Sequence, residues 1–188
     1  MIRAYAQVDR MSIEKLSEAD DTRMLLKNLH QIRGCSHSNI PMVIDCGNAG
    51  TVFRFLVSLL ASSPGTWLLT GTERMKARPV ADLVDALKHL GASIEYAEQQ
   101  GFPPLIIHGK VLTGGISAVS MQKSSQFASS LVLAAPTWKN GLELHLEGTL
   151  SSMPYLKMSL EMMRRFGAKV IENERIIHIL PVNYKKNN

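Results

Sequence analysis

Four short stretches of the chain combine residue types that can bind an anion. The first, Cys46–Thr51, reads Cys-Gly-Asn-Ala-Gly-Thr and follows an apolar run at 42–44. Small residues let backbone N–H groups approach a ligand closely, and a helix N-terminus adds a positive partial charge of about half a unit. The stretch is therefore a candidate site for a carboxylate or a phosphate. Taken alone, the stretch is explained more simply by a glycine-rich turn with Asn48 or Thr51 as helix cap.

The other three stretches place hydroxyl, amide and guanidinium groups at similar points of the chain. Ser124–Gln126 opens a predicted helix, and its hydroxyl and amide groups suit a phosphate or a polyol. Arg78 and Ser152 each stand just before a proline-initiated helix, where an arginine can pair bidentately with a carboxylate or phosphate. The structural alternatives are that the serines only cap helices and that the arginine is simply exposed.

These stretches recur because the chain repeats one order of elements. Gly-Thr pairs at 71–72 and 148–149 lie 77 residues apart, and Gly-Ala pairs at 91–92 and 167–168 lie 76 residues apart. Each copy places proline at the first turn of its second helix and glycine just past that helix's end. The expected helices span 51–61, 79–90, 126–135 and 154–166, and the expected strands 66–70, 105–108, 142–146 and 175–178.

A third, partial copy stands at the beginning, where Asp20–Thr22 opens a helix that Gly34 ends. The repeating unit is βαβαββ, which predicts an α/β (α+β) layered domain with helices packed together behind mixed sheets. We expect a single lobe over 1–188, made of a partial unit 1–45, a unit 46–110 and a unit 111–182. Pseudo-symmetric packing of the copies would bring their helix-opening turns to one end of the domain.

Composition narrows the class of protein. The 188 residues are 45% hydrophobic and 20% charged, which excludes a disordered chain. The net charge of +5 favours anionic partners, whereas 6% aromatic residues, not interleaved with the basic ones, disfavour nucleic acid relative to a small anion. Two cysteines make no disulfide framework, and no metal-ligand spacing occurs. Without a signal peptide or an apolar run long enough for a membrane span, the chain is expected to be cytoplasmic.

Other conspicuous residues are expected to be structural. His108 and His178 occupy equivalent strand positions in the two copies. Met158, Met162 and Met163 are expected on the core face of a helix rather than in a cofactor site.

In four places the sequence resembles the 5-enolpyruvylshikimate-3-phosphate (EPSP) synthase family. The run 47–56, Gly-Asn-Ala-Gly-Thr-Val-Phe-Arg-Phe-Leu, resembles that family's first signature. Arg74–Pro79, Ser124–Phe127 and Ser152–Tyr155 resemble three further blocks in the same order. The resemblance covers roughly residues 13 to 180.

The resemblance implies one lobe of an enolpyruvyl transferase-like inside-out α/β barrel, whose substrates bind between two such lobes. Family members transfer the enolpyruvyl group of phosphoenolpyruvate to shikimate 3-phosphate in aromatic amino-acid (chorismate) biosynthesis, with no cofactor and no metal. Relative to the family pattern, the opening strand of the first unit and the whole second lobe are missing. The proton-transfer groups are expected in those segments, so we assign no catalytic residue to this chain. We expect it to offer half of the site, to be inactive alone and to partner a missing second lobe.

The resemblance also implies a role for individual residues. The shikimate 3-phosphate site would comprise Ser124, Ser125, Gln126, Ser152 and Tyr155. The phosphoenolpyruvate site would comprise Gly50, Arg78 and Gln126, with Asn48, Thr51 and Arg54 in support.

Three alternatives remain open at this point, one of which is a gene fragment with no independent function. Another is a lobe of the sister enolpyruvyl transferase that acts on a UDP-sugar, which the Gly50–Arg54 spacing and the 74–79 block disfavour. The last is a non-catalytic module that uses the same repeated unit to bind RNA ends. Salt-dependent RNA binding would favour that module.

Overall fold

The structure is a computed structural model that describes residues 1–2, 5, 15–34, 40–122, 124–150 and 152–185. A helix, α2 (Asp20–Arg33), precedes two units of the same construction. The first unit contains β1 (Met42–Asp45), α3 (Gly50–Ala61), β2 (Gly65–Thr70), α4 (Glu73–Lys76), α5 (Ala81–His89), β3 (Ser93–Tyr96) and β4 (Leu105–Gly109). The second contains β5 (Gly115–Ser120), α6 (Ser125–Ala134), a 3-10 turn (Ala135–Thr137), β6 (Leu142–Glu147), α7 (Met153–Arg165), β7 (Val170–Glu172) and β8 (Ile176–Ile179).

Each unit folds into a four-stranded mixed sheet with the same strand order. The orders are β1-β2-β4-β3 and β5-β6-β8-β7. The first two strands of each sheet are parallel, with Ile44 opposite Leu69 and Val119 opposite Leu146, and all other pairings are antiparallel. The predicted βαβαββ repeat and the α/β fold class are therefore confirmed.

The two helices that follow the first strands are the most buried elements. Nine of the twelve residues of α3 and nine of the ten residues of α6 are buried. A helix that is apolar nearly all round must lie inside the protein, whereas a one-sided apolar stripe belongs at the surface. Accordingly α7 buries only Leu156, Leu160 and Met163 and presents its other faces outward.

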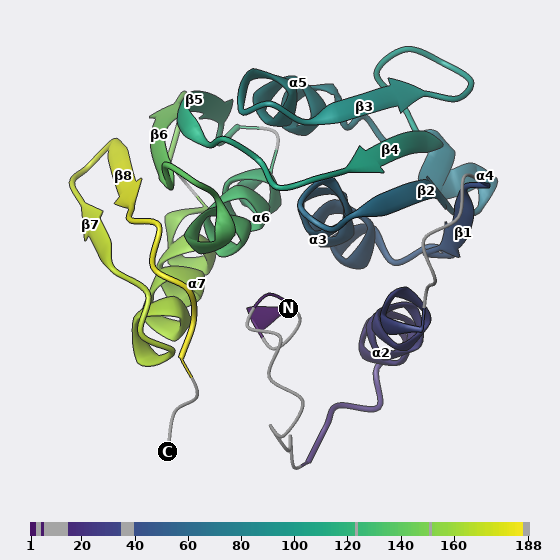
Figure 1. Ribbon diagram of the computed structural model, residues 1–188, viewed down its shortest axis with the longest axis horizontal. Coiled ribbons are helices and arrows are strands. Elements are labelled where there is room, and N and C mark those ends of the chain that lie inside the picture. The colour runs from purple at the N-terminus through teal and green to yellow at the C-terminus, as the bar shows by residue number, and fades with distance from the viewer. Residues whose placement is uncertain (3–4, 6–14, 35–39, 123, 151, 186–188) are drawn as a thin grey trace.

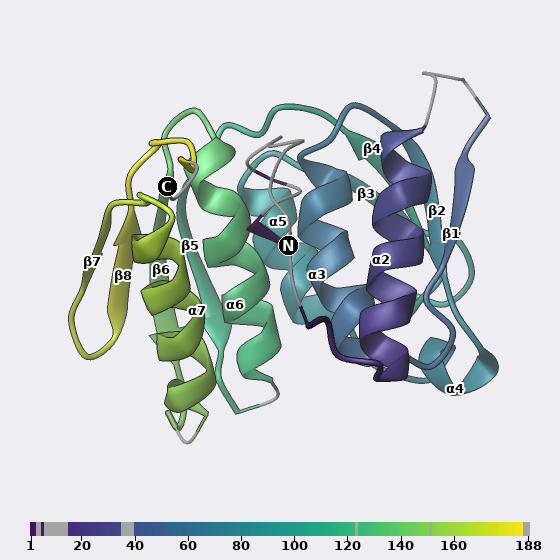
Figure 2. The ribbon, with the colours of Figure 1, turned by 90° about the horizontal axis from the view of Figure 1, so that it is seen from below.

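The helices form a layer against which the two sheets pack. Figure 2 shows α7, α6, α3 and α2 side by side in this order, and the contacts between consecutive helices agree. In Figure 1 the two sheets lie on the outer side of that layer, and α5 lies where the two units meet. There α5 contacts α3, α6 and β5, so the units share one continuous core. No described helix is both long enough and apolar enough to span a membrane.

The helix predicted to begin at Pro79 begins instead at Ala81, and the segment before it is not a simple loop. The backbone N–H of Val80 donates to the Gly101 carbonyl at 2.9 Å, which holds the chain in a non-helical conformation at that point. Upstream, the buried Met75 anchors the single helical turn α4. Contacts with distant segments, which the local sequence does not indicate, therefore determine where α5 begins and where the helical turn α4 forms.

The three methionines of α7 do not share one environment. Met163 is fully buried, but Met158 and Met162 are 64% and 44% exposed. The expectation that all three lie on a core face is therefore wrong for Met158 and Met162. Only the stripe at 156, 160 and 163 faces the core, because the sheet and α6 cover one side of this helix.

Candidate functional site

The N-terminal ends of α3, α6 and α7 meet at one cavity of about 390 Å³. Residues from all three helix ends form its wall: Thr51, Phe55, Ser124, Ser125, Gln126, Ser129, Ser152, Tyr155, Met158 and Ser159. These helices contact each other along the layer of Figure 2, which brings their beginnings to the same end of the lobe. The turns before α6 and α7 and the first turn of α3 therefore converge, as the repeat predicts, whereas Arg78 is not part of this cavity wall.

Side chains with hydroxyl groups line much of this cavity. Ser124 is the N-cap residue of α6, and its Oγ accepts a hydrogen bond from the backbone N–H of Gln126 at 3.1 Å. Within the described residues the side chains of Ser125 and Ser152 form no hydrogen bond, although Ser125 is only 7% exposed. Together with the unpaired N–H groups of a helix N-terminus, such hydroxyls favour an anionic or polyhydroxylated ligand.

The side chain of Gln126 links this serine-lined cavity to α3. Its Oε1 accepts a hydrogen bond from Arg54 Nη1 at 2.6 Å, and its Nε2 donates to Thr51 Oγ1 at 3.0 Å. The Arg54 guanidinium also lies over the ring of Phe127, 5.4 Å from the ring centroid. These contacts cross between the two units, since Arg54 and Gln126 are 72 residues apart.

Two guanidinium groups lie together beside Gly50, the first residue of α3. A side chain at Gly50 would collide with the Arg78 guanidinium and would lie close to that of Arg54. Burial lowers the pKa of Arg54, and the charge of Arg78 lowers that pKa further. Among the described residues neither arginine forms an ion pair with a carboxylate. An anion placed between them would relieve their mutual repulsion.

Asn48 lies outside the cavity wall and holds a turn. Its Oδ1 accepts a hydrogen bond from the Thr72 hydroxyl, and the Gly47 carbonyl accepts the Thr72 backbone N–H at 3.1 Å. The N-cap residue of α3 is Ala49, which makes no side-chain cap. The alternative in which Asn48 or Thr51 caps α3 is therefore wrong. Instead, Asn48 ties the glycine-rich turn to the turn after β2.

Four residues of the cavity wall were not predicted as site residues from the sequence, namely Phe55, Ser129, Met158 and Ser159. Helical spacing connects them with residues that the sequence did single out. Phe55, Ser129 and Ser159 each lie four positions after such a residue, and Met158 lies three positions after Tyr155. Residues three or four apart share a helix face, so this spacing is the signal that could have found them.

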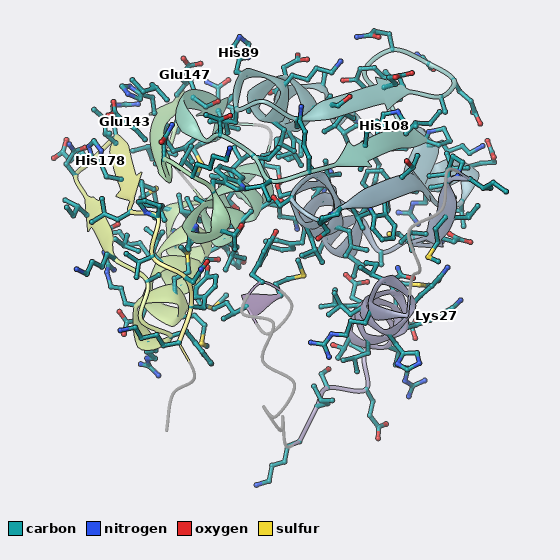
Figure 3. The ribbon with its side chains drawn as sticks, viewed as in Figure 1. Lys27, His89, His108, Glu143, Glu147 and His178 are labelled. Carbon is teal, nitrogen blue, oxygen red and sulfur yellow. The ribbon has the colours of Figure 1, made fainter. Side chains whose placement is uncertain are left out.

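The described wall of the cavity contains no carboxylate and no imidazole. His108 and His178 lie on the sheets, and Figure 3 labels them on the sides facing away from α3 and α6. Their ring nitrogens lie 3.6 Å from Glu95 and 3.5 Å from Glu143. The described part of the cavity can therefore bind and orient an anion, but it offers no side chain suited to general acid–base catalysis near neutral pH.

A lobe of repeated βαβαββ units, with a serine-lined cavity where its helices begin, defines the class of protein. The family model described as EPSP synthase (3-phosphoshikimate 1-carboxyvinyltransferase) matches residues 13–188. The chain therefore belongs to the EPSP synthase family.

Individual relatives agree with this assignment. A 3-phosphoshikimate 1-carboxyvinyltransferase of Bacteroides fragilis is 44% identical over 168 residues, which are 89% of this chain and 39% of the relative. A protein of the same name from Shewanella is 36% identical over 181 residues, and the match covers 87% of this chain and 42% of that relative. An EPSP synthase structure from Acinetobacter baumannii superimposes with a TM-score of 0.72 at 21% identity, over 87% of this chain and 40% of that one, and so supports the fold. The chain thus spans about two fifths of these relatives.

Proposed function

We propose that this chain forms one lobe of a 3-phosphoshikimate 1-carboxyvinyltransferase and supplies half of its substrate site. The observation that carries the proposal is the cavity where three helices begin, lined by serines and Gln126 and adjoined by two arginines without acidic partners. The relatives named above carry that activity in their names. The division into units 1–45, 46–110 and 111–182 and the cytoplasmic location belong to the same proposal and rest on the sequence.

Shikimate 3-phosphate is the substrate that the serine-lined cavity suits. Its phosphate would accept hydrogen bonds from Ser124, Ser125 and Ser152, with the helix N-termini adding favourable electrostatics. Tyr155, 67% exposed at the cavity rim, offers an aromatic face and a hydroxyl to the rest of the ligand. Gln126, at the boundary with α3, would contact both substrates.

Phosphoenolpyruvate is the substrate that the two arginines suit. A guanidinium presents paired donors that match a carboxylate or phosphate bidentately. Arg78 would bind the anion next to the backbone of Gly50, where only glycine leaves room for its guanidinium. Arg54, Thr51 and Asn48 would support this subsite, the last by holding the turn that leads into α3.

Enolpyruvyl transfer also needs groups that donate and accept a proton at the reacting carbons, which contribute about 10²–10⁴-fold to a rate. The described cavity wall supplies none of them. We therefore expect the purified chain to bind its substrates weakly and to release no phosphate from them. The remaining three fifths of the relatives' length would supply the missing groups.

The test is titration of the chain with shikimate 3-phosphate, followed by NMR chemical shifts of backbone amides. Binding near millimolar, about 4 kcal/mol, is expected because the cavity of this lobe alone is open to water. Shifts should concentrate at Ser124–Gln126 and Ser152. The double variant Ser125→Ala with Ser152→Ala should abolish detectable binding, since each lost hydrogen bond to a charged group costs about 1.5–3 kcal/mol.

The matched control replaces two serines outside the cavity, Ser93→Ala with Ser120→Ala, on β3 and β5. These substitutions should leave the titration unchanged. Unmoved amides around Ser124–Gln126 at saturating shikimate 3-phosphate would contradict the proposal. Binding of RNA that weakens steeply with salt, without binding of shikimate 3-phosphate, would support the RNA-end module instead.

A further inference from the structure

Polar bridges cross from α3 and its C-cap to α6 and the residue after the following 3-10 turn, and we call them the polar ladder. Its three bridges are Arg54–Gln126 at 2.6 Å, Ser58–Ser130 at 2.6 Å and Trp138–Ser62 at 2.9 Å. On α3 and its C-cap the members are four residues apart, so they occupy one helix face. Most residues between the two units are apolar, and apolar packing alone tolerates small shifts of one helix along the other. The hydrogen bonds of the polar ladder fix the position of α3 relative to α6.

The top bridge determines which way the Gln126 amide points. A guanidinium can only donate hydrogen bonds, so the atom facing Arg54 must be the amide oxygen. The amide nitrogen then faces Thr51 Oγ1, at 3.0 Å. The opposite orientation would set amide N–H donors against guanidinium N–H donors. In the observed orientation one amide N–H and one lone pair of the oxygen remain for a ligand.

Arg54 is itself held in place by the elements around it. Its guanidinium lies over the Phe127 ring, and its backbone carbonyl accepts a hydrogen bond from Ser130 Oγ at 2.7 Å. Within the described residues its Nε is buried without a hydrogen-bond partner. A buried unsatisfied donor destabilises the fold. Arg54 therefore keeps its contacts with Gln126 and Phe127 of α6, although its Nε is left without a hydrogen bond.

We propose that Arg54 is a positioning residue that fixes the Gln126 amide so that it presents an N–H donor to an anion in the serine-lined cavity. The lower bridges of the polar ladder hold Arg54 in register with Gln126. The inference rests on the proposed function only for the identity of the ligand. The orientation of the amide is a property of the chain itself and is measurable without any ligand.

The experiment follows the side-chain amide of Gln126 by NMR in the free chain. In the unsubstituted chain its two N–H protons should be distinct and one should show a through-space contact to Thr51. Arg54→Met should remove that contact and weaken shikimate 3-phosphate binding about tenfold, which corresponds to about 1.4 kcal/mol. Arg54→Lys, which keeps a donor but loses the planar fork, should restore part of both. The control is Arg165→Met, an exposed arginine paired with Glu161.

Each result decides between the two proposals. If Arg54→Met leaves the contact between Gln126 and Thr51 intact, the positioning role is wrong, even where the ligand still binds. If the amide is ordered by Arg54 but no shikimate 3-phosphate binds to the unsubstituted chain, the proposed function fails and the positioning of the amide stands. Where Arg54→Met does not fold, the unsubstituted chain decides, because a freely averaging Gln126 amide without the Thr51 contact overturns the inference.

Discussion

The β1–β4 unit and the β5–β8 unit share one topology but offer different chemistry where their central helices begin. In both, the residue after the first strand donates its backbone N–H to the end of the second strand. These bonds are Cys46 to Thr70 at 2.9 Å and Met121 to Glu147 at 3.0 Å. Beyond that shared point the two turns diverge, since α6 begins with a serine cap and α3 begins without any side-chain cap.

The divergence places different chemical groups at equivalent backbone positions of the two units. Without a side chain, Gly50 leaves space that the Arg78 guanidinium fills, so the β1–β4 unit contributes charge. The corresponding turn of the β5–β8 unit presents the hydroxyls of Ser124 and Ser125. Repetition thus supplies equivalent backbone positions, and the side chains at those positions decide whether an anion meets a guanidinium or a hydroxyl.

The largest expected effect tests whether the two units are one cooperative body. Leu56 of α3 and Leu131 of α6 are both fully buried in the shared core. We expect Leu56→Ala and Leu131→Ala each to lower the free energy of unfolding by about 2–5 kcal/mol, through lost burial and the cavity left behind. Urea denaturation followed by circular dichroism measures this, with Leu26→Ala at a 39% exposed leucine of α2 as the control. Two separate unfolding steps in either variant would show that the units are independent.

The next effect separates the subsites by charge. Arg78→Ala should weaken phosphoenolpyruvate binding by about 10- to 100-fold, because a hydrogen bond to a charged group contributes about 1.5–3 kcal/mol. Shikimate 3-phosphate affinity should stay within about twofold, since the serine-lined cavity does not include Arg78. Isothermal titration of both ligands makes the comparison. Arg74→Ala is the matched control, because Arg74 is an exposed arginine of the same segment. Equal losses for the two ligands would mean that the subsites are not distinct.

A smaller effect is expected when the space at Gly50 is filled. In Gly50→Ala the new methyl group collides with the Arg78 guanidinium, which must move away. We expect phosphoenolpyruvate binding to weaken about tenfold, corresponding to about 1.4 kcal/mol, with shikimate 3-phosphate binding unchanged. The control is Gly34→Ala after α2, where an added methyl group meets atoms no closer than 3.8 Å. Unchanged affinity for phosphoenolpyruvate would show that Arg78 binds the anion from another position.

Much of this comparison is visible in the sequence because it depends on local patterns. The recurrence of Gly-Thr and Gly-Ala pairs predicts the two equivalent units, and apolar spacing predicts their helices to within one or two residues. The convergence of Thr51 with Ser124–Gln126 follows from repetition, because these equivalent turns of the two units lie at the same end. Local sequence is sufficient wherever local energetics decides the structure.

What the sequence does not predict depends on contacts between distant segments. The sequence around Arg54 does not predict that its guanidinium donates a hydrogen bond to Gln126, 72 residues away, or that it lies beside Arg78. The start of α5 depends on a hydrogen bond from the Val80 N–H to the Gly101 carbonyl. The N-cap residue of α3 is Ala49 rather than a polar residue, because a hydrogen bond between Asn48 and Thr72 holds the preceding turn. The ligand roles of these residues stay predictions that the binding experiments test.

The smallest expected effect separates the two serines that stand at helix starts. Ser124 caps α6 through its bond to the Gln126 N–H, whereas Ser152, the N-cap residue of α7, makes no side-chain cap. Ser124→Ala should therefore lower the free energy of unfolding by about 1 kcal/mol. In a chain of this size that lowers the Tm by about 2–4 °C.

Ser152→Ala serves as the matched control, with a change in stability below about 0.5 kcal/mol, while still weakening shikimate 3-phosphate binding. Thermal unfolding without ligand, compared with titration of the same two variants, distinguishes a structural serine from one reserved for the ligand. An equal loss of stability in both variants would contradict the distinction, because it would mean that Ser152 also holds its helix. With the predicted result, Ser124 has two functions, capping α6 and binding the anion, and Ser152 has only the second.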